Sequence, residues 1–112
     1  MNKETHVAFI SKNIKEEFEL LKEGMYEDKK LFEFIKRAID DLKQNPFCGT
    51  RIQKMLWPKE YIQKYNLTNL WKYDLPNGWR LIYTTESDEI KIVNIILEWF
   101  NHKEYERRFN YN

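Results

Sequence analysis

The fold is decided by the stretch LWKYDLPNGWRLIYTT, residues 70–85. Two strand-like runs flank Asn77-Gly78. This dipeptide between alternating hydrophobic residues is the strongest short-range signal for a β-hairpin, because both residues tolerate the positive φ that a right-twisting hairpin needs. A third apolar run, residues 90–97, follows a polar turn at residues 86–89. We therefore expect a three-stranded antiparallel meander.

The middle strand of this meander carries the residue that raises the question of function. Successive side chains of a strand point to opposite faces, so Leu81 and Tyr83 share one face while Arg80 points to the other. An arginine inside a strand must reach solvent, a carboxylate or an anionic ligand, because burying its charge unpaired is very costly. Arg80 is therefore expected to reach solvent, to pair with a carboxylate such as one of a helix, or to serve an anionic ligand.

The preceding half of the chain supplies a strand and a pair of helices. Residues 5–10 form a short apolar run typical of a strand, and Ser11 is placed to cap the helix that follows. A second helix is expected from about residue 27 to Asn45-Pro46, which stops it. Its apolar residues recur at helical spacing and form one stripe: Leu31, Phe34, Ile35, Ala38, Ile39 and Leu42.

Two stretches rich in aromatic residues are less clearly patterned. Residues 50–57 read as a short strand or an irregular arm, and residues 59–65 as one or two helical turns whose rings cover the core. His102, Tyr105 and Phe109 fall on one face of a C-terminal helix, or on a short arm leaving the sheet.

Together these elements predict an α+β fold: an N-terminal strand, a helical hairpin, then a three- to four-stranded antiparallel meander. The last strand, residues 90–97, is apolar on both faces and is expected in the centre of the sheet. We expect the helices to pack on one sheet face and to leave the other face free for function.

Composition describes one folded domain spanning residues 1–112. Hydrophobic residues make up 42% and charged residues 33%, which is typical of a globular domain and excludes a disordered one. The net charge is +1, so bulk charge does not identify a nucleic-acid binder. The cations in the second half of the chain form either a basic face or an ordinary charged surface exposed to solvent. A single cysteine and the lack of an apolar leader or membrane span predict a cytoplasmic protein.

Several kinds of site find little support. One cysteine and two distant histidines give no zinc pattern, and three glycines give no phosphate-binding loop, so neither a metal nor a cofactor is expected. Spacing alone does not exclude a serine or cysteine hydrolase, but no nucleophile elbow is present. Cys48 is better interpreted as a filler than as a nucleophile.

The remaining polar residues suit metal-free cleavage of RNA. This reaction needs a group that takes the 2′-hydroxyl proton, a group that protonates the leaving 5′-oxygen, and cations that hold the charge growing on the phosphate. Arg80, His102 and Tyr105 are the candidate catalytic residues. The competing interpretations are a solvated or capping His102 and a structural ion pair at Arg80. The candidate RNA-binding residues are the cations Lys54, Arg51, Lys72, Arg107 and Arg108.

Several short motifs occur in a particular order: Asn45-Pro46, Lys54-Met55-Leu56, Trp71-Lys72-Tyr73-Asp74-Leu75, Trp79-Arg80-Leu81-Ile82-Tyr83 and His102-Lys103-Glu104-Tyr105. Over about residues 5–109, their order and spacing resemble the RelE/ParE superfamily of toxins from type II toxin-antitoxin systems. The RelE branch implies an endoribonuclease that cuts mRNA in the ribosomal A site without a metal, by 2′-hydroxyl attack that leaves a 2′,3′-cyclic phosphate.

The resemblance also implies roles for individual residues. Arg80 matches the strand arginine that contacts the scissile phosphate. Lys54 matches a basic residue lining the mRNA path. His102 and Tyr105 fall where the family places a terminal proton-transfer or base-stacking group.

The partners implied by the resemblance are mRNA on the ribosome and a cognate antitoxin protein, which wraps the toxin and blocks its basic face. No membrane partner is expected, and a homodimer of the free protein is compatible with the sequence without being fixed by it. Two alternatives stay open. One is a non-catalytic, gyrase-directed toxin of the ParE branch or an inactive binding domain of the same fold, which the near-neutral charge favours. The other is a sheet that binds single-stranded RNA by stacking bases on Tyr73, Tyr83 or Trp79.

Overall fold

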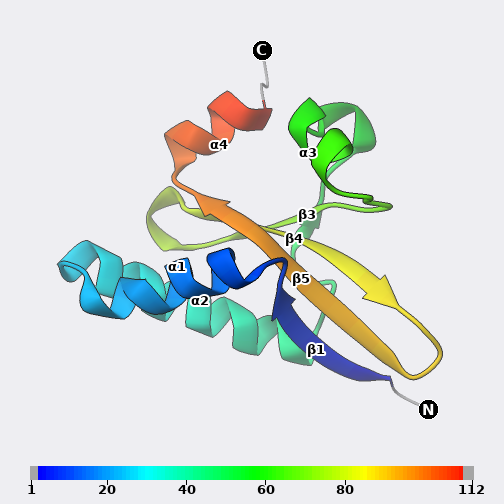
Figure 1. The fold of residues 1–112 in the computed structure, drawn as a ribbon, viewed down its shortest axis with the longest axis horizontal. Helices are drawn as coiled ribbons and strands as arrows, with labels where there is room; N and C mark the ends of the chain where they lie inside the picture. Colours follow the sequence, from blue (N-terminus) through cyan, green and yellow to red (C-terminus); the bar gives the residue numbers. More distant parts are fainter. Residues whose placement is uncertain (1–2, 110–112) are drawn as a thin grey trace.

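The computed structural model describes residues 3–109, which build a five-stranded mixed sheet with helices on both faces (Figure 1). The strand order is β1-β5-β4-β3-β2. Among the strands of residues 3–109, β1 pairs with β5 in parallel, and the other neighbours are antiparallel. The chain therefore has an α+β fold, as predicted. The strands are β1 (Glu4–Phe9), β2 (Thr50–Arg51), β3 (Trp71–Asp74), β4 (Arg80–Ser87) and β5 (Lys91–Phe100).

The helices begin and end close to the residues that the sequence indicates. The Ser11 hydroxyl accepts a hydrogen bond from the Ile14 backbone N–H at 3.2 Å, and α2 ends at Gln44, with Asn45 as its C-cap before Pro46. The helical elements are α1 (Lys12–Leu20), η1 (Leu21–Glu23), α2 (Tyr26–Gln44), η2 (Lys54–Leu56), α3 (Lys59–Lys64), η3 (Pro76–Gly78) and α4 (His102–Phe109).

The first core lies between α2 and one face of the sheet. The predicted stripe of α2 faces the sheet, where it packs against Leu81, Tyr83 and Ile96. Leu81 and Tyr83 belong to this core, whereas Ile82 between them packs in a second core, so the predicted alternation along β4 is confirmed. Four residues of the stripe are buried: Leu31, Ile35, Ala38 and Leu42. Phe34 and Ile39 pack against the same core.

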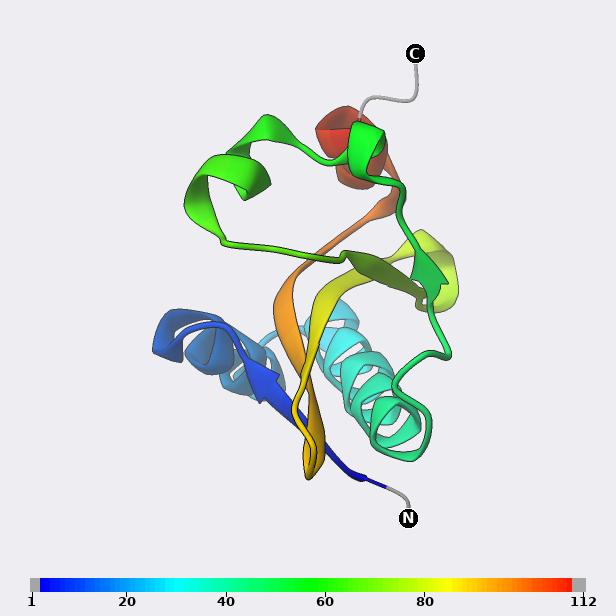
Figure 2. The same ribbon diagram turned by 90° about the vertical axis from the view of Figure 1, so that its right-hand side faces the viewer.

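A second core covers part of the opposite face, so the expectation of helices on one face only is wrong. Figure 2 shows α3 and α4 on the side of the sheet away from α1 and α2. The aromatic side chains of these helices are buried against the sheet. Tyr61, Tyr105 and Phe109 pack in one core with Ile82 and Phe100. The face that we expected to be free is thus filled over much of its area, and only its margin is left for a polar site.

The β3–β4 hairpin confirms the turn predicted from Asn77-Gly78. Asn77 has a φ of 61° and Gly78 a φ of 78°, the left-handed values that this dipeptide tolerates. The Leu75 backbone N–H donates to the Trp79 carbonyl at 2.8 Å, which closes the loop. The resulting register sets Asp74 directly opposite Arg80.

Candidate active site

Arg80 lies where three strands and the last helix meet. It is the first residue of β4, and its cross-strand partners are Asp74 on β3 and Phe100 on β5. Because β5 ends at Phe100 and α4 begins at His102, the imidazole comes two residues after that partner. The Arg80 Nη2 atom lies 3.5 Å from His102 Nδ1. The structure therefore brings together two candidate catalytic residues that are 22 positions apart in the chain.

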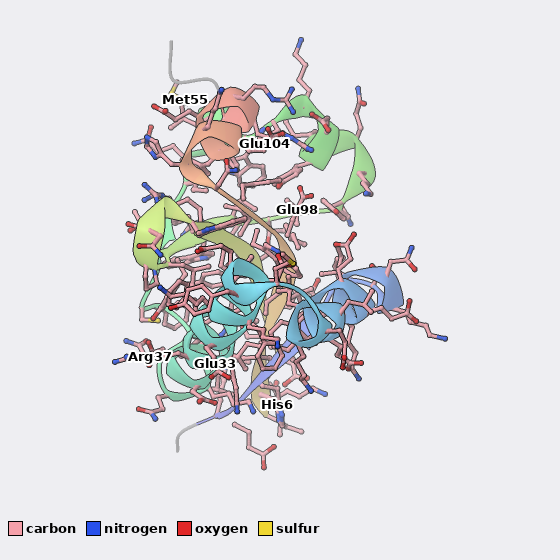
Figure 3. The ribbon with its side chains drawn as sticks, turned by 90° about the vertical axis from the view of Figure 1, so that its left-hand side faces the viewer. His6, Glu33, Arg37, Met55, Glu98 and Glu104 are labelled. Atoms are coloured by element: carbon pink, nitrogen blue, oxygen red, sulfur yellow. The ribbon has the colours of Figure 1, made fainter. Side chains whose placement is uncertain are left out.

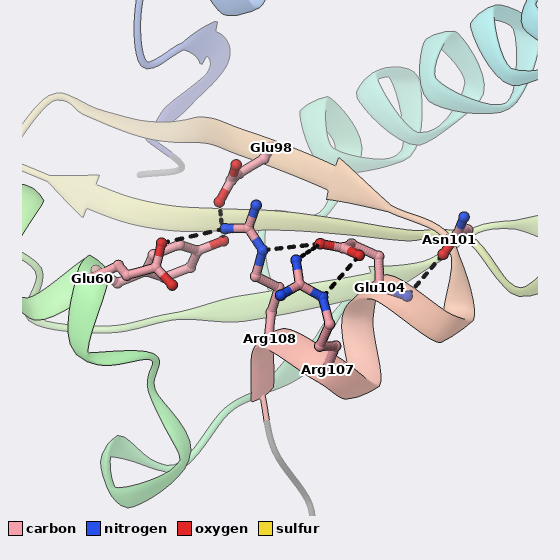
Figure 4. Close-up of polar contacts among 7 residues, drawn as sticks. Glu60, Glu98, Asn101, Glu104, Arg107 and Arg108 are labelled. Carbon is pink, nitrogen blue, oxygen red and sulfur yellow. Dashed lines mark hydrogen bonds and ion pairs between the residues drawn. The ribbon is translucent and has the colours of Figure 1, made fainter.

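The position of His102 depends on a helix cap and on a glycine. The Asn101 side-chain oxygen accepts from the Glu104 backbone N–H at 2.8 Å, which starts α4 at His102 (Figure 4). On the other side, a Cβ added to Gly78 would lie 3.2 Å from the His102 Cβ. The hairpin turn therefore lies close to the Cβ atom of His102, and a larger residue at Gly78 would push against it.

Both ring nitrogens of His102 have partners. Nε2 lies 3.1 Å from a carboxylate oxygen of Glu106, one helical turn further on, and Nδ1 faces the Arg80 guanidinium. A neutral ring with its proton on Nε2 satisfies both contacts, because a guanidinium only donates and a carboxylate only accepts. The histidine side chain is 58% exposed, so the ring is oriented by the protein and still accessible to a substrate.

Tyr105, the third candidate catalytic residue, lies under the guanidinium. The Arg80 Cζ atom is 5.5 Å from the centre of the Tyr105 ring, which is itself stacked on Phe109 at 4.6 Å. Tyr105 is only 4% exposed. This placement favours a role in holding Arg80, by a cation–π contact, over direct contact with a substrate.

A carboxylate that the sequence analysis did not single out completes the site. Asp74 Oδ1 lies 3.0 Å from Lys72 Nζ and 3.0 Å from Arg80 Nε. Arg80 Nη1 also donates to the Trp79 carbonyl at 3.3 Å. The prediction that Arg80 meets a carboxylate or an anionic ligand is therefore met by a carboxylate of the neighbouring strand, not of a helix. The pairing of Asp74 with Arg80 could have been found from the hairpin register, which places position 74 opposite position 80.

The contact between Asp74 and Arg80 Nε is short but poorly directed. The two atoms are close enough for an ion pair, yet the Nε–H is not aimed at the carboxylate. Arg80 Nε is buried, and within residues 3–109 no acceptor meets it in hydrogen-bonding geometry. We therefore treat this contact as an ion pair without a hydrogen bond.

Two of the predicted RNA-binding cations are engaged elsewhere. Glu104 accepts from Arg107 and, at 3.2 Å, from Arg108 Nε, and these hydrogen bonds hold the pKa of the Glu104 carboxyl below its usual range (Figure 4). Arg108 also lies 3.4 Å from a carboxylate oxygen of Glu60 in α3 and stacks over the Phe100 ring at 5.0 Å. Arg107 and Arg108 thus reinforce α4, and Arg108 links it to α3.

The other predicted cations lie along the β2–β3 edge of the sheet. Lys72 faces Thr50 across these two strands, and Arg51 follows at the next position. Arg51 and Lys54 are exposed, and neither forms an ion pair in the part of the chain that the structure describes. They are therefore accessible charges on the same edge as Lys72.

A polar groove of about 480 Å³ runs beside this edge, between the end of α2 and β3. The Tyr73 hydroxyl donates to Asp41 there, and burial together with this bond raises the pKa of Tyr73 to about 12. Burial and the nearby Asp41 also raise the pKa of the Cys48 thiol, so Cys48 is not an activated nucleophile. The groove is lined by Asp41, Gln44, Asn45, Cys48, Gly49, Thr50, Lys72, Tyr73 and Asp74.

Within residues 3–109, no group of histidine, cysteine or carboxylate side chains is arranged to hold a metal ion. None of the helices over these residues combines the length and the apolar character that crossing a membrane requires. Comparison of the chain with known protein families, with curated proteins and with solved structures finds no match.

Proposed function

We propose that this chain is the toxin of a type II toxin-antitoxin system, an endoribonuclease of the RelE type that cuts ribosome-bound mRNA in the cytoplasm. The proposal is carried by the convergence of Arg80 and His102, whose side chains lie 3.5 Å apart. A fixed cation beside an accessible imidazole is the pair of groups that metal-free cleavage of RNA requires. The motif order that resembles RelE toxins supports the same assignment.

Each residue of the site has a task in this reaction. Arg80 holds the nonbridging oxygens of the scissile phosphate, and Tyr105 holds the face of the guanidinium. His102 accepts the proton of the 2′-hydroxyl as the O2′–P bond forms and the P–O5′ bond breaks. The imidazolium then returns this proton to solvent, and the departing 5′-oxygen takes up a proton from solvent. The products are a 2′,3′-cyclic phosphate and a 5′-hydroxyl, with no net gain or loss of protons.

The remaining cations and the partners complete the proposal. Lys54, Arg51 and Lys72 would contact the phosphates on either side of the cut. A cognate antitoxin would bind over the same edge and keep RNA away from Arg80 until it is removed. Since Arg107 and Arg108 are paired with carboxylates, we assign them a smaller part in RNA binding.

The second candidate function is a toxin that binds gyrase and cuts no RNA. The near-neutral charge favours it, since the net charge is +1 and both Arg80 and Lys72 are paired with Asp74. The third, a sheet that stacks single-stranded RNA on its rings, loses support because Tyr83 is fully buried and the Tyr73 hydroxyl is bonded to Asp41.

Two substitutions with matched controls test the proposal. Arg80→Ala and His102→Ala are expected to relieve growth arrest when the chain is expressed in bacteria, and to lower the rate of mRNA cleavage by about 100- to 1000-fold. The controls are Lys91→Ala, at the start of β5 and beside Glu4 of β1, and His6→Ala on β1. Figure 3 shows His6 at the end of the molecule opposite Glu104 of α4. Both controls should stay toxic, and circular dichroism should show that all four variants are folded.

Sequencing of cellular RNA separates the alternatives in the same experiment. Cuts within translated regions, lost in both site variants, support the nuclease. Growth arrest with intact mRNA and induction of the DNA-damage response supports the gyrase-directed alternative instead. If both site variants remain as toxic as the unsubstituted chain, the roles of Arg80 and His102 are wrong.

A further inference from the structure

Asp74 binds the two cations of the site through a single oxygen atom. Its Oδ1 lies 3.0 Å from both Lys72 Nζ and Arg80 Nε. The cations are mostly enclosed, with 21% of the Lys72 and 18% of the Arg80 side chain exposed, whereas Asp74 is 57% exposed. The two positive groups are therefore fixed in place, and the carboxylate is the member of the cluster that is free to leave.

The geometry at Arg80 leaves a donor for an anion of a different shape. A carboxylate that filled the site well would accept from Nε–H, yet this buried donor is not aimed at Asp74. Buried polar groups are satisfied in the great majority of native structures, so an unsatisfied one calls for an explanation. A phosphate carries several oxygen acceptors around one centre and can meet Nε–H and the lysine together.

We propose that Lys72 and Arg80 form a binding site for a phosphate group of the RNA, and that Asp74 occupies this site in the free protein as a competing anion. The inference rests on the proposed function, because it takes Arg80 as a phosphate ligand. It adds that the substrate has to displace a carboxylate of the protein itself. The pairing of both Lys72 and Arg80 with Asp74 is then the property of a self-occupied site.

The surroundings of Asp74 give the displaced side chain somewhere to go. Asp74 lines both the groove of about 480 Å³ beside β3 and a second hollow of about 460 Å³ that reaches Pro76. Both are open to solvent, so a carboxylate that rotates away from Lys72 and Arg80 is hydrated and does not become buried unpaired. Displacement therefore requires a change of rotamer and no change in the backbone.

The test measures binding of a probe that cannot be cleaved, a single-stranded oligoribonucleotide with a 2′-O-methyl group on every nucleotide. Asp74→Asn is expected to bind this probe about tenfold more tightly than the unsubstituted chain. The reason is that the phosphate no longer competes with the Asp74 carboxylate for Lys72 and Arg80. Asp74→Ser, which removes the same charge with a smaller side chain, should behave alike.

The matched control is Glu89→Gln, which removes one negative charge in the β4–β5 turn, at the end of the sheet opposite α4 (Figure 1). It should change the affinity by less than about twofold, because exposed charges far from the site are screened. Adding Arg80→Ala to Asp74→Asn should abolish the gain. Binding by both Asp74 variants that is unchanged or weaker would overturn the inference.

A second readout separates this inference from the proposed nuclease activity. The Nε–H signal of Arg80 can be followed by NMR while sulfate, a phosphate mimic, is added. In Asp74→Asn it should shift at about tenfold lower sulfate concentration than in the unsubstituted chain. If it does so while no condition yields RNA cleavage, the anion site stands and the nuclease proposal fails. If sulfate leaves Arg80 Nε–H unmoved in both proteins, the anion site itself is contradicted.

Discussion

Replacing Gly78 by alanine tests how the hairpin turn holds His102. Gly78 has a φ of 78°, a region where alanine costs about 1–2 kcal/mol relative to glycine. The new Cβ would also stand 3.2 Å from the His102 Cβ, closer than ordinary contacts, so one of the two backbones has to shift by a few tenths of an ångström. We expect the free energy of unfolding to fall by about 2 kcal/mol, with an altered environment of the imidazole.

Asn77→Ala is the matched control, because Asn77 is the other turn residue at positive φ, at 61°. It shares the backbone strain and should cost about 1 kcal/mol. Urea unfolding gives both free energies, and NMR of the imidazole protons compares His102 with His6, the only other histidine, as an internal reference. The reasoning is refuted if Gly78→Ala is no less stable than Asn77→Ala and leaves the His102 signals unchanged.

Three further predictions follow from shifted pKa values. Because the pKa of Tyr73 is raised to about 12, the stability that its neutral hydroxyl contributes is complete below about pH 10 and is lost as the pH rises through 12. In Tyr73→Phe, the free energy of unfolding should therefore fall less steeply with pH above about pH 10. The Cys48 thiol should react slowly with iodoacetamide at pH 8 and faster in Asp41→Asn, as followed by mass spectrometry. Glu104→Gln should destabilise the protein at pH 7, and its difference in unfolding free energy from the unsubstituted chain should shrink on acidification, because a lowered carboxyl pKa gives stability that is present above the ordinary carboxyl pKa and is lost as the pH falls through the lowered one.

The parts of the fold that depend on local pattern were predictable. The stripe of α2 follows from helical spacing, and the β3–β4 hairpin follows from Asn77-Gly78. In each case the residues that give the signal are close to one another in the sequence. The second core was not predictable in this way. Tyr61 and Phe109 meet edge to face at 6.0 Å from opposite ends of the second half of the chain, and no local period records such a contact.

The candidate site shows the same division. The sequence places Arg80 on a strand and His102 just after the last strand, and the sheet register then brings them together. Asp74 and Glu106 were not predicted, although the register and an i,i+4 spacing place them beside Arg80 and His102, because exposed carboxylates are common in the sequence and only the fold shows which of them face the site. The burial of Tyr105 depends on the second core, which is why its exposure could not be judged in advance.

The chemistry of the RNA ends tests the central claim most directly. Translating ribosomes are mixed with the purified protein, and the fragments are analysed by mass spectrometry for the groups at each new end. Attack by the 2′-hydroxyl with Arg80 and His102 in the assigned roles leaves a 2′,3′-cyclic phosphate and a 5′-hydroxyl, and His102→Ala makes no such ends. Fragments with a 3′-hydroxyl and a 5′-phosphate, or intact mRNA beside a folded and toxic protein, would contradict the account.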